Sequence, residues 1–143
     1  ILLEEVFMII GKACRDKAIK IHKRYVAHKY LFEGIEDQIK QVLLNVLQNS
    51  IDSISEGGDI ILNMAENSNV IMLEIQDTGH GIEKENQRFI FDPFYTTRGK
   101  EGTGLGLSVS YGIIKKHGGQ ICIESQLNVG STVTLVLPKK QIL

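Results

Sequence analysis

The stretch FDPFYTTRGKEGTGLGLS, residues 91–108, contains the clearest functional signal in this chain. Three alternating glycines, Gly102, Gly104 and Gly106, come directly before an apolar pattern typical of a helix. Because glycine has no Cβ, such a backbone can bring several N–H groups against a bulky anion, and the following helix adds the positive end of its dipole. The stretch therefore predicts a phosphate-binding loop, although the same glycine spacing also occurs in ordinary turns.

Length and composition indicate one globular domain. The chain has 143 residues, and its 16 basic and 17 acidic residues are nearly balanced, so nothing supports binding to nucleic acid or to a membrane surface. The two cysteines, Cys14 and Cys122, lack metal-ligand spacing and suit a reducing, cytoplasmic compartment. The opening ILLEEVFMIIGKA includes Glu4 and Glu5, which is typical of an amphipathic helix and not of a signal peptide or membrane span. Because the chain lacks an initiator methionine, we expect it to be a piece of a longer protein.

Hydrophobic periodicity predicts a mixture of helices and strands. Two of the strands form a hairpin, which implies antiparallel pairing, so the expected fold class is α+β. We expect a two-layer α/β sandwich with a mixed, mostly antiparallel sheet covered by helices on one face. The irregular stretch after Asp77, to about residue 104, is too long for a plain connection between two elements and is expected to be a functional lid. Helices are expected near 3–16, 36–55 and 105–117, and strands near 19–26, 29–33, 59–66, 69–77, 120–126 and 131–137.

The expected helix 36–55 has an apolar arc and, opposite it, a polar stripe with five amides. A solvated face would explain the stripe, but such a face normally uses Glu and Lys, and Asn is a poorer helix former than Ala. An Asn carbonyl oxygen is a neutral, hard ligand that can hold Mg²⁺ beside a triphosphate without adding negative charge. Asn45 and Asn49, one turn apart, are the candidates for this role. The stripe consists of Gln38, Gln41, Asn45, Gln48, Asn49, Asp52 and Glu56.

The sequence DTGHGI, residues 77–82, begins where an apolar strand ends. Asp77 can accept a hydrogen bond from the exocyclic amine of adenine, whereas guanine presents an oxygen at that edge and would be disfavoured. Gly79 and Gly81 would let a flat ring approach the backbone. The alternative is a simple Asx turn.

In this order and spacing, the segments resemble the catalytic ATP-binding domain of sensor histidine kinases. That domain has the Bergerat-type ATP-binding fold, shared with gyrase, Hsp90, MutL and pyruvate dehydrogenase kinase. QVLLNVLQNSIDSI resembles the N box, DTGHGI the G1 box, FDPFYTTR the F box and GTGLGLS the G2 box. VGSTVTLVLP resembles the closing strand whose threonine, here Thr132, lies beside the adenine. The F box is most similar to that of nitrogen-regulation and sporulation kinases, and the resemblance implies a single catalytic domain over residues 1–143.

The resemblance implies roles for the matching residues. Asn49 would bind Mg²⁺ with Asn45 supporting it, and Asp77 would bind the adenine amino group. Asp52 stands where many histidine kinases have a lysine, which implies that one phosphate contact is missing. Arg98 and Lys100 would neutralise phosphate charge. The remaining residues are expected along the base, at the lid hinge or around the triphosphate: Gly79, Gly81, Ile82, Phe91, Phe94, Thr97, Gly102, Thr103, Gly104, Leu105 and Gly106.

The reaction implied by the resemblance is transfer of the γ-phosphoryl group of ATP to a histidine. In relatives that hydrolyse ATP, a glutamate stands at the position of Asn45, and an amide cannot take up a proton. None of the four histidines has the setting of a phosphoacceptor. His22, His28 and His117 are expected to be structural, with His117 as a cation at a helix end, whereas for His80 contact with a nucleotide and simple exposure of its loop are equally good explanations.

The acceptor is therefore expected on a separate dimerisation domain of the same bacterial kinase, upstream of a response regulator. The domain is expected in the cytoplasm and without membrane contact of its own. This expectation holds even if the parent kinase is anchored in a membrane. Two alternatives remain open. One is an ATP-hydrolysing clamp of the gyrase or MutL type, and the other is a nucleotide-binding regulatory or docking module without phosphotransfer.

Overall fold

The computed structural model describes residues 2–25, 32–91 and 106–140. It contains three α-helices, five strands and one short 3₁₀ helix within these ranges. The helices are α1 (Leu2–Asp16), α2 (Glu36–Ser53), η1 (Gln87–Phe89) and α3 (Gly106–Lys116), and the strands are β1 (Ile19–Arg24), β2 (Gly58–Glu66), β3 (Val70–Asp77), β4 (Gln120–Gln126) and β5 (Gly130–Pro138).

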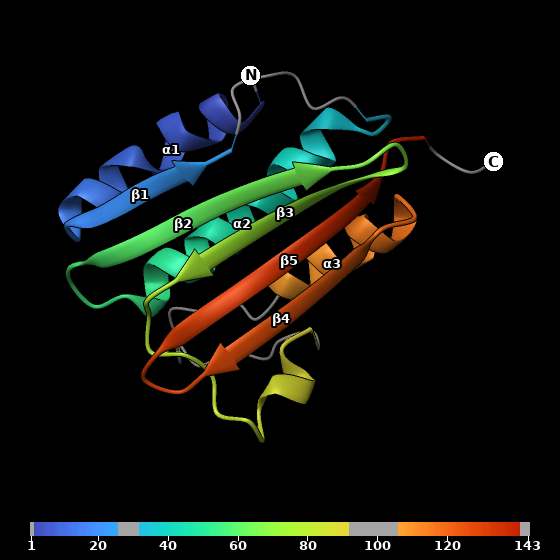
Figure 1. Cartoon of the computed structure of the whole chain (residues 1–143). Helices are drawn as coiled ribbons and strands as arrows, with labels where there is room; N and C mark the ends of the chain where they lie inside the picture. The colour runs from blue at the N-terminus through green and yellow to red at the C-terminus, as the bar shows by residue number, and fades with distance from the viewer. Residues whose placement is uncertain (1, 26–31, 92–105, 141–143) are drawn as a thin grey trace.

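The strands form one sheet in the order β1-β2-β3-β5-β4, and all three α-helices lie on the same side of it (Figure 1). Strands β1 and β2 are parallel, because α2 lies between them in the chain as a crossover. The other neighbouring pairs are antiparallel. The predicted α+β sandwich with a mixed, mostly antiparallel sheet and one covered face is therefore confirmed.

Alternation along the strands determines which side chains face the helices. In β3, Ile71, Leu73 and Ile75 are buried, and Asp77 is buried at the end of the same row. Gln76, between Ile75 and Asp77, is exposed on the other face of the sheet. Helix α2 packs its apolar arc into this core, with Val42 among its fully buried residues. The side chains of β3 that face the helices are therefore apolar except for the last one, the carboxylate of Asp77, which lies at the end of the covered face.

Two long-range contacts hold the ends of α2. The ammonium group of Lys40 lies 2.8 Å from the carboxylate of Glu5 and joins α2 to α1. The ammonium group of Lys17 donates to the carbonyl of Ile51 at 2.9 Å, which satisfies a helix C-terminus that has no basic residue in its last turn. In the part of the chain that the structure describes, no helix has the length and apolar character needed to cross a membrane.

Two sequence-based expectations need correction. Most of the strand expected at 29–33 falls outside the described residues, but Phe32 and Glu33 are not in a strand. His117 does not act as a cation at the end of α3. Its Nδ1 donates to the carbonyl of Ile113 at 2.8 Å and its Nε2 accepts the N–H of Ile35 at 3.1 Å, a pairing that requires the neutral ring.

Candidate nucleotide-binding site

Asp77 is the best-held polar group of the site. The residue is only 5% exposed at the end of β3. One carboxylate oxygen, Oδ1, accepts the N–H of Gly79 at 2.9 Å and the N–H of Ser131 at 3.3 Å. The hydroxyl of Ser53 also lies 3.3 Å from Oδ1, but its one hydrogen is shared with the carbonyl of Ser50, which is nearer at 2.8 Å. These donors fix the carboxylate and stabilise its charge. Oδ2 takes part in none of these contacts, so the arrangement leaves it for a donor from outside the fold.

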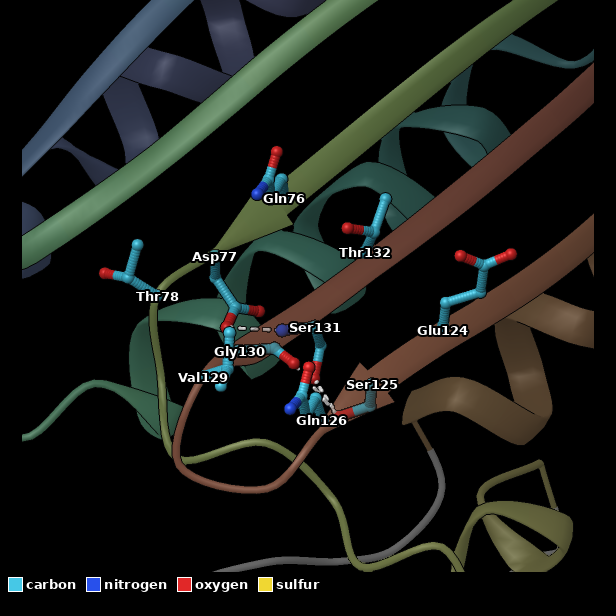
Figure 2. A pocket seen from close by; sticks show the side chains of 10 residues that line it. All are labelled: Gln76, Asp77, Thr78, Glu124, Ser125, Gln126, Val129, Gly130, Ser131 and Thr132. Atoms are coloured by element: carbon cyan, nitrogen blue, oxygen red, sulfur yellow. Dashed lines mark hydrogen bonds between the residues drawn. The ribbon is translucent and has the colours of Figure 1, made fainter.

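The strand register bears on the prediction for Thr132. In the β3–β5 pair, Asp77 lies opposite Ser131, whereas Thr132 lies opposite Gln76 on the other face of the sheet. Figure 2 shows the Asp77–Ser131 hydrogen bond, together with the residues of a hollow of about 400 Å³ that includes both Gln76 and Thr132. Ser131, and not Thr132, is therefore the β5 side chain beside Asp77.

The two glycines after Asp77 are required by packing. A Cβ on Gly79 would collide with the side chain of Ser53, and one on Gly81 would collide with the backbone of Gln126. Gly81 also has a φ of +72°, which strains other residues. The loop is thus pressed between the end of α2 and the β4–β5 turn, and this close fit explains both glycines. Their predicted position along a base remains a prediction.

Three polar residues form a line along α2 at intervals of one turn: Asn45, Asn49 and Ser53. Ser53 contacts Asp77 at one end of this line. At the other end, Asn45 contacts the first residue of α3, Gly106. Eight residues of helix correspond to about 12 Å. The line therefore connects the carboxylate to the start of α3 over a distance that a nucleotide can span between its base and its phosphates.

The two asparagines differ in their contacts. The amide nitrogen of Asn45 donates to the carbonyl of Gly106 at 3.0 Å and to the hydroxyl of Ser110 at 3.2 Å, and its oxygen accepts from Gln41 at 2.8 Å. Asn49 is half-buried, and no other residue of the described chain holds its amide. Asn49 is thus the more available ligand of the two, whereas Asn45 joins two helices.

The other predicted site residues divide into two groups. Asp52 lies on α2 and accepts a hydrogen bond from the Gln48 amide at 2.9 Å, so two members of the polar stripe bind each other there. The ring of Phe91 lies 5.3 Å from that of Tyr111 on α3, centroid to centroid, in agreement with a packing role. The second group lies outside the described residues: Phe94, Thr97, Arg98, Lys100, Gly102, Thr103, Gly104 and Leu105.

Sequence reasoning missed a polar cluster around Ile82. The N–H of Ile82 donates to the hydroxyl of Ser125 at 2.7 Å, and the Gln87 amide donates to the carbonyls of both residues, at 3.1 Å and 2.9 Å. Gln87 lies in η1, so the cluster ties the irregular segment after Ile82 to β4. Only the tertiary fold brings these residues together, and no local pattern could have revealed the cluster.

The available ligands suit a magnesium ion that arrives with a nucleotide. Among the described residues, no group of three or more His, Cys, Asp or Glu side chains could hold a metal ion. Mg²⁺ usually keeps several waters and binds through few protein ligands together with substrate phosphates. A half-buried, unengaged amide such as Asn49 fits that pattern, whereas a metal that requires a full protein cage would not fit.

Comparison with known proteins agrees with this geometry. Residues 34–141 match the family described as histidine kinase-, DNA gyrase B-, and HSP90-like ATPase. Sporulation kinase C of Bacillus subtilis (strain 168) is 37% identical over 110 residues, which are 77% of this chain and 26% of that protein. Sensor histidine kinase ZraS of Escherichia coli (strain K12) is 34% identical over 139 residues, which are 96% of this chain and 29% of that protein. The chain thus spans less than a third of the length of these relatives.

Solved structures show the same fold. The catalytic domain of histidine kinase ThkA matches with a TM-score of 0.85 and 33% identity, covering 97% of this chain and 92% of that chain. A structure of ThkA in complex with the response regulator protein TrrA matches with a TM-score of 0.82 and 30% identity, covering 96% of this chain and 39% of that chain. The predicted similarity to sporulation kinases is confirmed. The chain belongs to the family of histidine kinase-, DNA gyrase B- and HSP90-like ATPases, and it is a histidine kinase catalytic domain by its fold and its relatives.

Proposed function

We propose that this chain binds ATP with Mg²⁺ and donates the γ-phosphoryl group to a histidine on the dimerisation domain of its kinase. The observation that carries the proposal is the buried Asp77 carboxylate, whose Oδ1 is held by the N–H groups of Gly79 and Ser131. With Oδ1 occupied, the carboxylate is fixed in place and its Oδ2 can accept a hydrogen bond from the exocyclic amine of adenine at little cost in reorganisation. Guanine presents an acceptor at the same edge, which would leave two acceptors facing each other.

The phosphates would lie at the other end of the polar line on α2. The first turn of α3, starting at Gly106, has backbone N–H groups without partners inside the helix, which favours an anion there. Asn49, between Asp77 and this turn, would hold Mg²⁺ without adding negative charge. When bound, Mg²⁺ supplies charge neutralisation to the transferred phosphoryl group.

The transfer breaks the bond between the γ-phosphorus and its bridging oxygen and forms a bond from the phosphorus to an imidazole nitrogen of the acceptor. ADP leaves with the electron pair, and the acceptor imidazole loses its N–H proton. The chain's own contribution would be positioning and charge stabilisation. Asn45 cannot accept a proton from water, and its amide is engaged with α3. This favours phosphotransfer over the hydrolysing clamp.

The exposed part of α3 is the surface where we place the acceptor domain. Val109 and Tyr111 are 43% and 40% exposed there, next to the first turn of the helix. Apolar side chains at this place would dock a helical domain that presents the acceptor histidine. The relative ThkA has been solved in complex with a response regulator, and we propose such a protein as the next acceptor. The chain would act in the cytoplasm, where ATP is available.

The proposal can be tested with ATP labelled in the γ-phosphate and a purified dimerisation domain that contains the histidine. We expect acid-labile label on that domain, and none when its histidine is replaced by glutamine or when the chain carries Asp77→Asn. Bound ATP without any transfer would instead support the docking module. Steady release of phosphate in the absence of the dimerisation domain would support the clamp.

A further inference from the structure

Ser110 is a buried polar residue to which neither the sequence motifs nor the proposed function gives a role. It lies on α3 and is 0% exposed. Its hydroxyl donates to the carbonyl of Gly106 at 2.9 Å and accepts from the Asn45 amide at 3.2 Å. Serine in the middle of a helix is somewhat unfavourable compared with alanine. Helix propensity therefore does not explain why a serine stands at this position of α3.

The contacts of Ser110 close a triangle between two helices. The same amide nitrogen of Asn45 also donates to the carbonyl of Gly106, at 3.0 Å. Gln41 donates to the oxygen of Asn45 at 2.8 Å, which turns the amide nitrogen toward α3. Apolar packing between α2 and α3 is non-directional, whereas these hydrogen bonds have a required direction and length. The triangle therefore determines where the first turn of α3 lies along α2.

That position matters because of what the two helices carry. Asn45 is one turn from Asn49, the proposed ligand of Mg²⁺, and Gly106 is the first residue of α3. A triphosphate that contacts both Asn49 and the first turn of α3 would span the distance between the two helices, and the triangle of hydrogen bonds sets this distance. Misplacement of such groups by about 1 Å can reduce activity on the order of 100-fold.

We propose that Ser110 is a positioning residue that acts through Asn45 and holds the first turn of α3 at the distance from α2 that the triphosphate requires. The inference rests on the proposed function and deepens it. Ser110 serves the phosphate end of the site only. The adenine end is built by Asp77 and its donors, which do not contact the triangle.

The test compares two ligands by calorimetric titration in Mg²⁺. ATP uses both ends of the site, whereas adenosine uses only the base end. Removing the hydroxyl in Ser110→Ala leaves a buried amide hydrogen without one of its acceptors, and we expect ATP affinity to fall about tenfold. Adenosine affinity should stay within about twofold, because no phosphate contact is involved.

Three further variants separate positioning from packing. Ser110→Cys keeps most of the volume but is a weak hydrogen-bonding group, so it should resemble Ser110→Ala. Ser50→Ala is the matched control, because Ser50 is also a buried serine, 2% exposed, on the neighbouring helix α2. It should bind both ligands as the wild type does. Asn45→Ala combined with Ser110→Ala should lose no more ATP affinity than the worse single variant, since both act through one contact.

Each outcome decides the matter. A fall in ATP affinity with unchanged adenosine affinity supports the positioning role, and faster amide exchange in the first turn of α3 of the variant supports it independently. Unchanged ATP affinity, or an equal loss for both ligands, overturns the positioning role and leaves the proposed function intact. If the folded wild type fails to bind ATP at all, both proposals are wrong.

Discussion

Replacing Asp77 by asparagine separates the two tasks of this side chain. Asparagine has nearly the same shape, and its Oδ1 can still accept from the N–H groups of Gly79 and Ser131. Its nitrogen replaces Oδ2, however, and two donors would then face each other at the adenine amine. A hydrogen bond to a charged group contributes about 1.5–3 kcal/mol, so we expect ATP to bind about 10- to 100-fold more weakly. The unfolding temperature should stay close to that of the wild type.

The assay is calorimetric titration with ATP in Mg²⁺, beside thermal unfolding followed by circular dichroism. Asp77→Ala serves for comparison, because it removes the acceptor of the Gly79 and Ser131 N–H groups and should also destabilise the fold, by about 1–3 kcal/mol. Thr132→Val changes the opposite face of the sheet and should leave ATP affinity unaltered. If folded Asp77→Asn binds ATP within twofold of the wild type, the assignment of the base end is wrong. A large loss in Thr132→Val would restore the assignment made from the sequence.

Three more predictions concern other parts of the molecule. Val109→Glu places a charge on the exposed part of α3, and it should reduce labelling of a dimerisation domain at least several-fold while titration shows unchanged ATP affinity; equal labelling would show that this surface is not used. In a native thiol titration, exposed Cys122 should react quickly and Cys14 only on unfolding, because Cys14 is 3% exposed and burial raises its pKa; equal rates would contradict this. The hydrogen bond between Glu5 and Lys40 lowers the pKa of Glu5 below 4.5 and raises the pKa of Lys40 above 10.5. Its stabilising contribution should therefore be present between these values, and be lost as the pH falls through the folded pKa of the carboxyl or rises through that of the ammonium group. Glu5→Gln should thus lower the unfolding temperature at pH 7 and not in strong acid, and a pH-independent difference would refute the linkage.

Most of the secondary structure could be predicted because its periodicity is regular. The arc of α2 and the alternation in β3 each contain apolar residues at the interval of their element, and the structure has both elements within a few residues of the expected bounds. The strand expected at 29–33 failed at Phe32 and Glu33, since a short apolar run carries no reliable period. The hydrogen bond that His117 accepts comes from the N–H of Ile35, which is far away in the sequence, so no local pattern could predict it.

The place of Ser131 beside Asp77 could have been predicted. Val133, Leu135 and Leu137 are the apolar, inward residues of β5, and Ser131 has the same parity, so alternation alone places Ser131 on the inner face. The role of Ser53 could likewise be seen from the helical interval that relates it to Asn45 and Asn49. The contact between Asn45 and Ser110 could not be predicted, because it depends on how α2 and α3 cross.

The most direct test of the central claim is a calorimetric titration of the 143-residue chain with ATP and with GTP in Mg²⁺. The Asp77 geometry predicts saturable binding of ATP and, for GTP, binding at least about tenfold weaker, the cost of roughly one unpaired acceptor. Equal affinity for the two nucleotides, or no ATP binding by a folded sample, would contradict the account.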